Sequence, residues 1–281
     1  MNTSIPAIEF DVIVIGGSYA GLSAALQLAR ARRRVLVVDA GQRRNRFAVH
    51  SHGFLSNDGA EASAIVERSR AQLQAYPHVA MARDTVTQAW ADGDRCGVRF
   101  ADGGEVSSRR LILAGGVVDG LPDIDGLAER WGRSVFHCPY CHGYELDEGA
   151  IGVIATGPVA MHHALLLPDW GRVTLFLNDA FVPDAMQRAA LAARGVTVEA
   201  APVARIEEEA TVVLKDGRRH AMAGLFLAPR TSVSGSLAQQ LGCAMEAGPL
   251  GEFVQTDALK ATTAPGVFCC GDMARAAGNV A

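Results

Sequence analysis

The residues best suited to chemistry are Cys138 and Cys141, which lie in the segment FHCPYCHGYE directly before His142. A CxxC pair can bind a metal, form a structural bridge or carry electrons as a dithiol and disulfide. A structural zinc site needs four ligands and usually takes two such pairs, and this chain contains one. A bridge over so short a loop would constrain little of the unfolded chain. The sequence therefore predicts a redox-active pair and no metal.

The residues around this pair favour thiol chemistry. Cys138 can cap a short helix that begins at Pro139, because a proline in the first helical position loses no hydrogen bond. The positive end of a helix dipole lowers the pKa of a thiol and favours the nucleophilic thiolate. His142 can accept and return a proton near neutral pH, and a packing or surface role is its alternative. The remaining cysteines lie in apolar runs and are expected in the core: Cys96, Cys243, Cys269 and Cys270.

A glycine-rich turn near the N-terminus is the second functional signal. A β-branched run at 10–15 is followed by GGSYAG and then by apolar residues at helical spacing, and Asp39 ends the next apolar run. Such a unit is typical of a dinucleotide site, with the pyrophosphate at the helix N-terminus and the carboxylate on a ribose hydroxyl. Ser18 replaces one glycine of the usual frame, and a tight turn without a ligand is the alternative. The predicted cofactor-binding residues are Gly16, Gly17, Ser18, Tyr19, Ala20, Gly21, Asp39, Ala40, Gly271 and Asp272.

The strand, turn, helix, strand order occurs a second time over residues 150–179, after the CxxC. Between the two units, residues 79–113 alternate and contain turn signals, which predicts a small antiparallel meander. We therefore predict an α/β fold with two Rossmann-like dinucleotide-binding domains of three-layer β/β/α form, one inserted in the other. The predicted boundaries are 1–117 and 230–281 for the first dinucleotide-binding domain and 118–229 for the inserted one, which carries the CxxC.

Composition narrows the class of protein further. The chain has 281 residues, of which 49% are hydrophobic and 20% charged, so it can bury a sizeable core. Its net charge of −4 and the lack of a basic block argue against nucleic acid or a membrane surface as a partner. No apolar run is long enough to span a bilayer, and the N-terminus lacks the features of a signal peptide. We expect a cytoplasmic protein.

Taken in order, GGSYAGLSAA, the central CxxC and APGVFCCGD resemble the low-molecular-weight thioredoxin reductases over nearly the whole chain. The resemblance implies a homodimer, an FAD-binding domain formed by residues 1–117 and 230–281, and an inserted nicotinamide-type domain, residues 118–229, that carries the redox pair. It also implies that Cys141 faces the flavin, that Cys138 exchanges with substrate, and that His142 replaces the acid/base carboxylate of those enzymes. A helix follows Gly271–Asp272 in the family, and its expected start coincides with the end of this sequence. We therefore expect either a further tail or a flavin ring without that cover.

The form CPYCHGYE is more similar to a subgroup, the FAD-dependent dithiol oxidases that close disulfides in natural products such as gliotoxin, holomycin and romidepsin. In the second glycine-rich turn, Ala155 stands in place of the first glycine and Pro158 follows Gly157. No arginine follows the next strand, and Asp179 would repel the 2′-phosphate of NADPH. NADH is left open. We predict a small-molecule dithiol as substrate and oxygen as acceptor. An NAD(P)H- or ferredoxin-driven reductase of a thioredoxin-like protein is the main alternative, and a flavin-binding redox sensor without turnover is the third.

Several other side chains are left with two interpretations. His50 and His52 either line a substrate pocket near the flavin or are solvated loop residues. His162 and His163 are assigned no chemistry, and at least one is expected to pack in the core. The three arginines of residues 43–46 either meet FAD phosphates or form a basic surface loop, and the surface loop is favoured.

Overall fold

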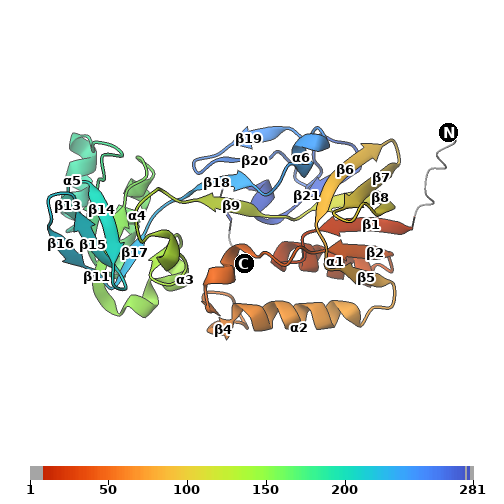
Figure 1. Cartoon of the computed structure of the whole chain (residues 1–281), viewed down its shortest axis with the longest axis horizontal. Helices are drawn as coiled ribbons and strands as arrows, with labels where there is room; N and C mark the ends of the chain where they lie inside the picture. The colour runs from red at the N-terminus through yellow and green to blue at the C-terminus, as the bar shows by residue number, and fades with distance from the viewer. Residues whose placement is uncertain (1–8, 276, 279–281) are drawn as a thin grey trace. The chain divides into compact units, whose positions relative to one another are not determined.

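The computed structural model describes residues 9–275, 277 and 278, and the chain divides into two compact units (Figure 1). Unit 1 consists of Met1–Arg46, Ala62–Val118 and Thr231–Ala281. Unit 2 consists of Phe47–Glu61 and Asp119–Arg230. The sequence did not indicate that the segment Phe47–Glu61 belongs with the CxxC. The assignment of the units as FAD-binding and nicotinamide-type domains stays a prediction.

Unit 1 is built on a seven-stranded sheet in the order β5-β2-β1-β8-β7-β6, with β21 also paired to β8. Its strands are β1 (Phe10–Ile15), β2 (Val35–Val38), β5 (Val79–Ala82), β6 (Val86–Asp92), β7 (Arg95–Phe100), β8 (Glu105–Leu113) and β21 (Val267–Cys269). The predicted meander is present in β6, β7 and β8, which are antiparallel. It is wrong for residues 79–82, because helix α2 returns the chain to the free edge of β2, where β5 pairs in parallel.

Two helices, α1 (Tyr19–Arg30) and α2 (Ala62–Gln74), cover one face of this sheet (Figure 1). Both faces of this sheet are covered, and strand β1 accordingly has apolar side chains on both sides. Val12 and Val14 pack with the helices, whereas Ile13 and Ile15 face the opposite core, since successive side chains of a strand point to opposite faces. The remaining elements of this part of the chain are η1 (Arg44–Phe47), β9 (Val117–Gly120), β18 (Arg230–Val233), α6 (Leu237–Gln240), β19 (Met245–Ala247), β20 (Glu252–Val254) and η5 (Gly271–Ala274).

Unit 2 has a five-stranded parallel sheet in the order β10-β17-β11-β12-β13 and a three-stranded antiparallel sheet, β14-β15-β16. Its strands are β10 (Val135–Phe136), β11 (Glu148–Ile154), β12 (Gly171–Phe176), β13 (Thr197–Glu199), β14 (Val203–Glu207), β15 (Thr211–Leu214), β16 (Arg219–Ala221) and β17 (Gly224–Phe226). Its helical and short elements are β3 (His50–Ser51), β4 (Ala60–Glu61), η2 (Ala128–Arg130), α3 (Pro139–His142), η3 (Tyr144–Leu146), α4 (Ala160–Leu166), η4 (Leu167–Asp169) and α5 (Ala185–Ala193).

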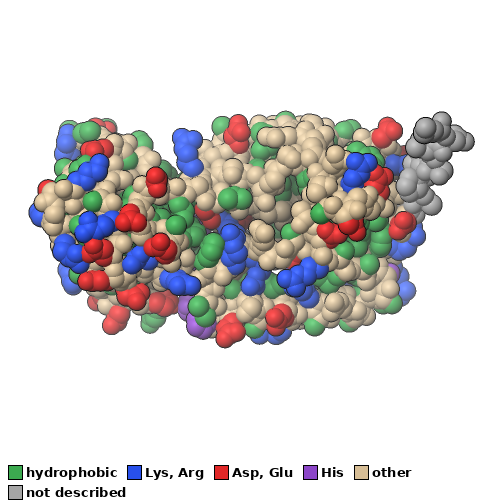
Figure 2. All heavy atoms as spheres, viewed as in Figure 1, with side chains coloured by type: hydrophobic (Ala, Val, Ile, Leu, Met, Phe, Trp, Pro, Cys, Tyr) green, Lys and Arg blue, Asp and Glu red, His purple; other side chains and the backbone are tan. Residues whose placement is uncertain are grey.

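Two cores hold unit 2 together as three layers. Phe136, Val153 and Phe226 pack with the helices on one face of the parallel sheet. Ile154 and Phe176 pack on the other face, against the antiparallel sheet. Acidic and basic side chains are interspersed on the face that Figure 2 shows. In the part of the chain that the structure describes, no helix combines the length and the apolar character of a membrane span.

Candidate active site

The glycine-rich turn forms a cradle at the carboxyl end of β1. Gly16 has a φ of +113°, and a Cβ atom added there would collide with the backbone of Ala114. A Cβ at Gly17 would lie 2.5 Å from Cβ of Asp39, and one at Gly21 would overlap the carbonyl oxygen of Gly16. Ser18 is the N-cap of α1, with extended backbone and no side-chain capping bond. The turn therefore has no room for side chains at these three positions and brings its backbone close to the strand ends, which fits a bound dinucleotide pyrophosphate.

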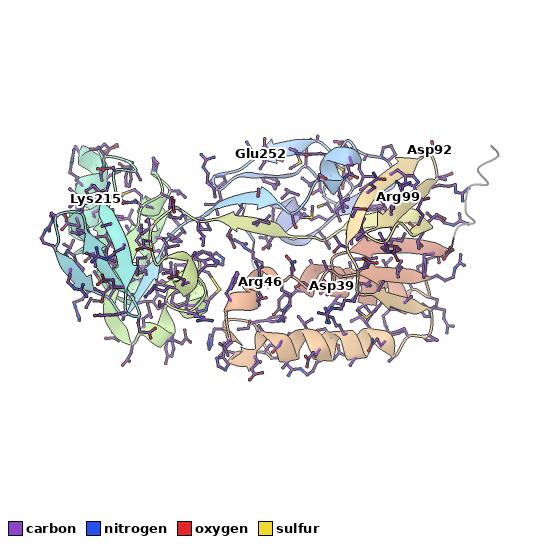
Figure 3. All side chains as sticks on the ribbon, in the orientation of Figure 1. Asp39, Arg46, Asp92, Arg99, Lys215 and Glu252 are labelled. Carbon is purple, nitrogen blue, oxygen red and sulfur yellow. A yellow bond between two sulfur atoms is a disulfide. The ribbon has the colours of Figure 1, made fainter. Side chains whose placement is uncertain are left out.

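The two predicted cofactor motifs meet in unit 1, although one lies near each end of the chain. A Cβ at Gly271, whose φ is +70°, would lie 2.7 Å from Cβ of Ala20 in the first turn of α1. This contact places Asp272 beside the cradle. Figure 3 labels Asp39, which follows β2 in the same unit and borders the cradle through Gly17. The residues present thus fit FAD, and the structure brings the predicted set together.

Three residues at this site were not predicted as ligands. Arg44 forms an ion pair with Asp272 at 2.8 Å, and its side chain is only 19% exposed, so the surface-loop interpretation is wrong for this arginine. Arg70 pairs with Asp39. Asn45 donates a hydrogen bond from Nδ2 to the Tyr19 hydroxyl at 3.1 Å. Each of the two predicted ligand carboxylates thus has an arginine partner. The only sign of these three contacts in the sequence was the basic composition of residues 43–46.

The CxxC lies where β10 leads into α3, at the carboxyl end of the parallel sheet of unit 2. Cys138 is the N-cap of α3 and Pro139 is its first residue, as the sequence predicted, although no side-chain capping bond forms. Cys138 and Cys141 form a disulfide with their Cα atoms 5.3 Å apart, and both are partly exposed. The S–S bond appears in yellow beside α3 in Figure 3. The pair is therefore formed, accessible and held by a rigid strand-to-helix turn.

His142 lies directly under this turn. Its ring stacks on Phe136, with 4.1 Å between ring centroids and 14° between the planes. No described residue forms a hydrogen bond with its buried Nδ1. Burial lowers the pKa of His142 to about 4, while the charge of Glu145 raises that pKa and the charge of His52 lowers it. At neutral pH His142 is thus an uncharged imidazole that can accept a proton but holds it weakly. The sequence did not predict this lowered pKa.

A second buried histidine supports the same region from α4. The ring of His163 contacts Phe226 at 6.3 Å between centroids, and Phe226 contacts Phe136 at 5.6 Å. His163 also hydrogen-bonds with the backbone of His137, the residue before the CxxC. The expectation that at least one histidine of this pair packs in the core is confirmed, since His163 is 7% exposed.

We expect His163 to make the fold less stable as the pH falls from 6.5 to 4. Burial lowers the pKa of His163 from 6.5 to about 4, so the unfolded chain binds more protons than the folded one in this window. The free energy of unfolding then falls by up to about 1.4 kcal/mol per pH unit. Urea unfolding of wild type and of His163→Leu at several pH values measures the difference. A slope that is unchanged in His163→Leu would contradict this, and His162→Gln, at an exposed neighbouring position, is the control.

The segment Phe47–Glu61 brings a third histidine to the CxxC. His52 Nδ1 lies 3.3 Å from Glu145 Oε1 and 3.9 Å from Asp58 Oδ1. The His50 ring lies 6.4 Å from the His52 ring. His52 is thus a partly exposed member of the charged surroundings of the redox pair.

The second glycine-rich turn differs from the first in its geometry. Helix α1 begins at the fourth residue after β1, whereas α4 begins two positions later after β11, at Ala160. Pro158 occupies the position equivalent to Tyr19 and supplies no N–H group. The Thr156 hydroxyl donates to the carbonyl of Ala228 at 2.7 Å. The turn therefore offers fewer free donors to a pyrophosphate than the turn at β1.

No group of three or more histidine, cysteine or acidic side chains is placed to hold a metal ion within residues 9–275, 277 and 278. The carboxylates at the cradle are those of Asp39 and Asp272, and each is paired with an arginine. The carboxylate beside the CxxC is that of Glu145, which is paired with His52. The described residues therefore form two separate features, a cradle that fits a nucleotide in unit 1 and a disulfide with an adjoining imidazole in unit 2.

Comparisons with known proteins agree with this architecture. The model of the family described as pyridine nucleotide-disulphide oxidoreductase matches residues 10–281. "Thioredoxin reductase sirT" of Leptosphaeria maculans is 34% identical, and the alignment covers 94% of this chain and 87% of that protein. The solved structure of an oxidoreductase from Agrobacterium tumefaciens is 55% identical with a TM-score of 0.95, covering 97% of this chain and 92% of that one.

A further solved structure, that of HlmI, is 40% identical with a TM-score of 0.89 and covers 96% of this chain and 86% of its own. The breadth of these matches confirms the predicted fold class, a mixed α/β chain with two Rossmann-like units. The predicted resemblance to proteins of the thioredoxin reductase type is confirmed as well.

Proposed function

Because this chain belongs to the pyridine nucleotide-disulphide oxidoreductase family, and is thus a disulfide oxidoreductase of the thioredoxin reductase type, we propose that it is an FAD-dependent dithiol oxidase. Its substrate would be a small-molecule dithiol, and oxygen would be the final acceptor. The observation that carries the proposal is the accessible Cys138–Cys141 disulfide beside the uncharged imidazole of His142. A disulfide is the oxidised form, ready to accept electrons from a thiol.

The reaction follows from thiol–disulfide exchange. His142 accepts the proton of one substrate thiol, and the thiolate attacks Sγ of Cys138, the exchanging cysteine by family resemblance. The Cys138–Cys141 bond breaks and its electron pair leaves on Cys141. The second substrate thiol loses its proton and attacks the substrate sulfur of the mixed disulfide, which forms the product disulfide and releases Cys138 as a thiolate. FAD, held by the cradle of Gly16 and Asp272, would accept the electron pair from the reduced cysteines.

The direction of electron flow rests on the second glycine-rich turn. A nicotinamide nucleotide needs a pyrophosphate cradle, and Pro158 and Ala155 reduce the donors and the space that this turn provides. Asp179 follows β12 at the place where a 2′-phosphate would lie in a Rossmann-like unit, and its charge disfavours NADPH. These features support the view that the dithiol substrate is the electron donor and that a nicotinamide nucleotide is not.

An NAD(P)H- or ferredoxin-dependent reductase of a thioredoxin-like protein is the second candidate. The curated relatives carry the name thioredoxin reductase, and this favours it. The exposed Tyr140 and Tyr144, 70% and 84% accessible beside the disulfide, suit a protein or a small aromatic substrate equally well. The two candidate functions differ in their electron donor, which is a dithiol for the oxidase and a nicotinamide or ferredoxin for the reductase.

We expect a small dithiol, and neither NADPH nor NADH, to bleach the visible absorbance of the flavin in the purified holoprotein without oxygen. Dithiothreitol, NADPH and NADH are added in separate anaerobic cuvettes, and air is then admitted. Bleaching by dithiothreitol and recovery of the colour in air support the oxidase. Rapid bleaching by a nicotinamide would establish the reductase instead, because the second turn would then be functional.

The proposal also includes a homodimer and a cytoplasmic location. Sedimentation analysis of the holoprotein tests the first, and fractionation of the source cells tests the second. The acidic net charge of −4 supports neither a nucleic acid nor a membrane surface as partner.

A further inference from the structure

The segment Phe47–Glu61 lies against the helix that carries the redox pair. A Cβ atom added at Gly53 would lie 3.7 Å from the backbone oxygen of Tyr140, the residue between the two cysteines. The neighbouring His52 directs Nδ1 at Glu145 Oε1, 3.3 Å away. Glu145 itself lies in η3, directly after α3. A histidine from a distant part of the sequence is therefore paired with a carboxylate of the CxxC segment.

This pair is electrostatically coupled to His142. The charge of Glu145 raises the pKa of His142 and that of His52 lowers it, so the three groups lie within range of one another. The other titratable groups that face His52 are Asp58, at 3.9 Å, and His50, at 6.4 Å between rings. The charge states of Glu145 and His52 thus change the proton affinity of His142.

The proposed reaction releases two protons at this site. The first leaves when one substrate thiol becomes the attacking thiolate, and the second leaves when the other thiol attacks the mixed disulfide. Two thiolates form on the enzyme, one substrate S–S bond forms and one enzyme S–S bond breaks, so electrons and protons balance. His142 can take one proton only, and its stacked, buried ring holds that proton weakly. A second acceptor at the site would spare His142 from releasing the first proton to water before the second thiol reacts.

We propose that His52, paired with Glu145, is that second proton acceptor. The proposal rests on the proposed dithiol oxidase function and deepens it. The carboxylates of Glu145 and Asp58 approach Nδ1, at 3.3 and 3.9 Å, so we assign the exchange of the proton with substrate to Nε2 of His52. The side chains of His52 and Glu145 are 24% and 41% exposed, which lets the stored proton pass to water. Together, His142 and His52 give each thiol its own base.

The test separates the two proton transfers in the holoprotein. A monothiol, 2-mercaptoethanol, forms the mixed disulfide after one deprotonation, and acid quenching with mass spectrometry measures its rate. Dithiothreitol needs both deprotonations, and anaerobic stopped-flow absorbance measures flavin bleaching. The variants are His52→Gln and Glu145→Gln. His162→Gln is the matched control, an exposed histidine of the same unit to which no chemistry is assigned. FAD content and the protein disulfide are measured in each variant.

We expect His52→Gln to form the monothiol adduct at a rate within about twofold of wild type and to bleach with dithiothreitol roughly 10- to 100-fold more slowly. Its pH–rate profile should lose one ionisation, and added imidazole should restore part of the rate. Equal rates in both assays, or equal losses in both, would overturn the role of His52. If wild type is not bleached by dithiothreitol, the proposed function itself fails, and the two failures are thereby distinguished.

Discussion

Replacing Cys141 with serine should abolish flavin reduction by dithiothreitol, with a loss of about 10⁴-fold or more, while FAD stays bound. The electron pair of the substrate passes to the enzyme only by cleavage of the Cys138–Cys141 bond, and a serine oxygen cannot form that bond. Cys138→Ser should cause the same loss. Anaerobic stopped-flow absorbance of the purified holoproteins measures both.

The two variants should differ in what they trap. Cys141→Ser retains the cysteine that exchanges with substrate, so it should accumulate a stable mixed disulfide with an aromatic disulfide reagent, and Cys138→Ser should not. Cys243→Ser is the control, because that buried thiol donates to the Thr262 hydroxyl and serine keeps the hydrogen bond. Bleaching of Cys141→Ser at the wild-type rate would mean that electrons reach the flavin without the disulfide, and the thiol route would be wrong.

The sequence predicts best those parts of the molecule that local chemistry determines. The strand at 10–15, the helix after GGSYAG and the helix beginning at Pro139 all follow from signals within a few residues, and the structure has each of them. Glycine at 21 is required by a contact inside the β-α-β unit, with the carbonyl oxygen of Gly16, whereas glycine at 16 is required by the backbone of Ala114, which follows β8. The predicted cofactor residues came together in unit 1 because three separate strands, β1, β2 and β21, end at the same edge of one sheet.

Contacts between segments far apart in the chain could not be predicted from the sequence. Arg44 and Asp272 are 228 residues apart, and no local pattern distinguishes that arginine from its two basic neighbours. The pairing of His52 with Glu145 depends on a polar segment leaving unit 1 to join unit 2. The state of His142 was also hidden. Its type suggests a pKa near neutrality, whereas stacking on Phe136 buries it and lowers the pKa to about 4.

The parallel pairing of residues 79–82 was missed for a related reason. Alternation of apolar residues identifies a strand, but it does not specify its partner. β5 joins β2 because α2 covers the sheet and returns the chain to the open edge, a consequence of packing that appears only in three dimensions. The class of enzyme, a disulfide oxidoreductase, was predictable from motifs for the same reason that local structure was, and the electrostatic detail of the site was not.

Adding one methyl group at Gly21 should remove FAD from the protein. In Gly21→Ala the new Cβ would overlap the carbonyl oxygen of Gly16, and it would also press on a Val14 methyl group 3.2 Å away. Moving the backbone of Gly16 or the fully buried side chain of Val14 would cost packing energy in a closely packed core. We therefore expect α1 to move away from β1, which opens the pyrophosphate cradle. We expect the FAD content of the purified protein to fall at least about tenfold, since the binding geometry is lost. Absorbance after denaturation measures it.

Ser23→Thr is the matched control for that substitution. It also adds one methyl group to α1, but at an exposed position two residues further along the helix. It should retain full FAD. Labelling of free thiols tests whether unit 2 survives in Gly21→Ala, because the Cys138–Cys141 disulfide should still form there. A variant with its disulfide intact and its flavin lost would show that the cradle at β1 holds the cofactor, whereas full FAD content in Gly21→Ala would place the flavin elsewhere in the chain.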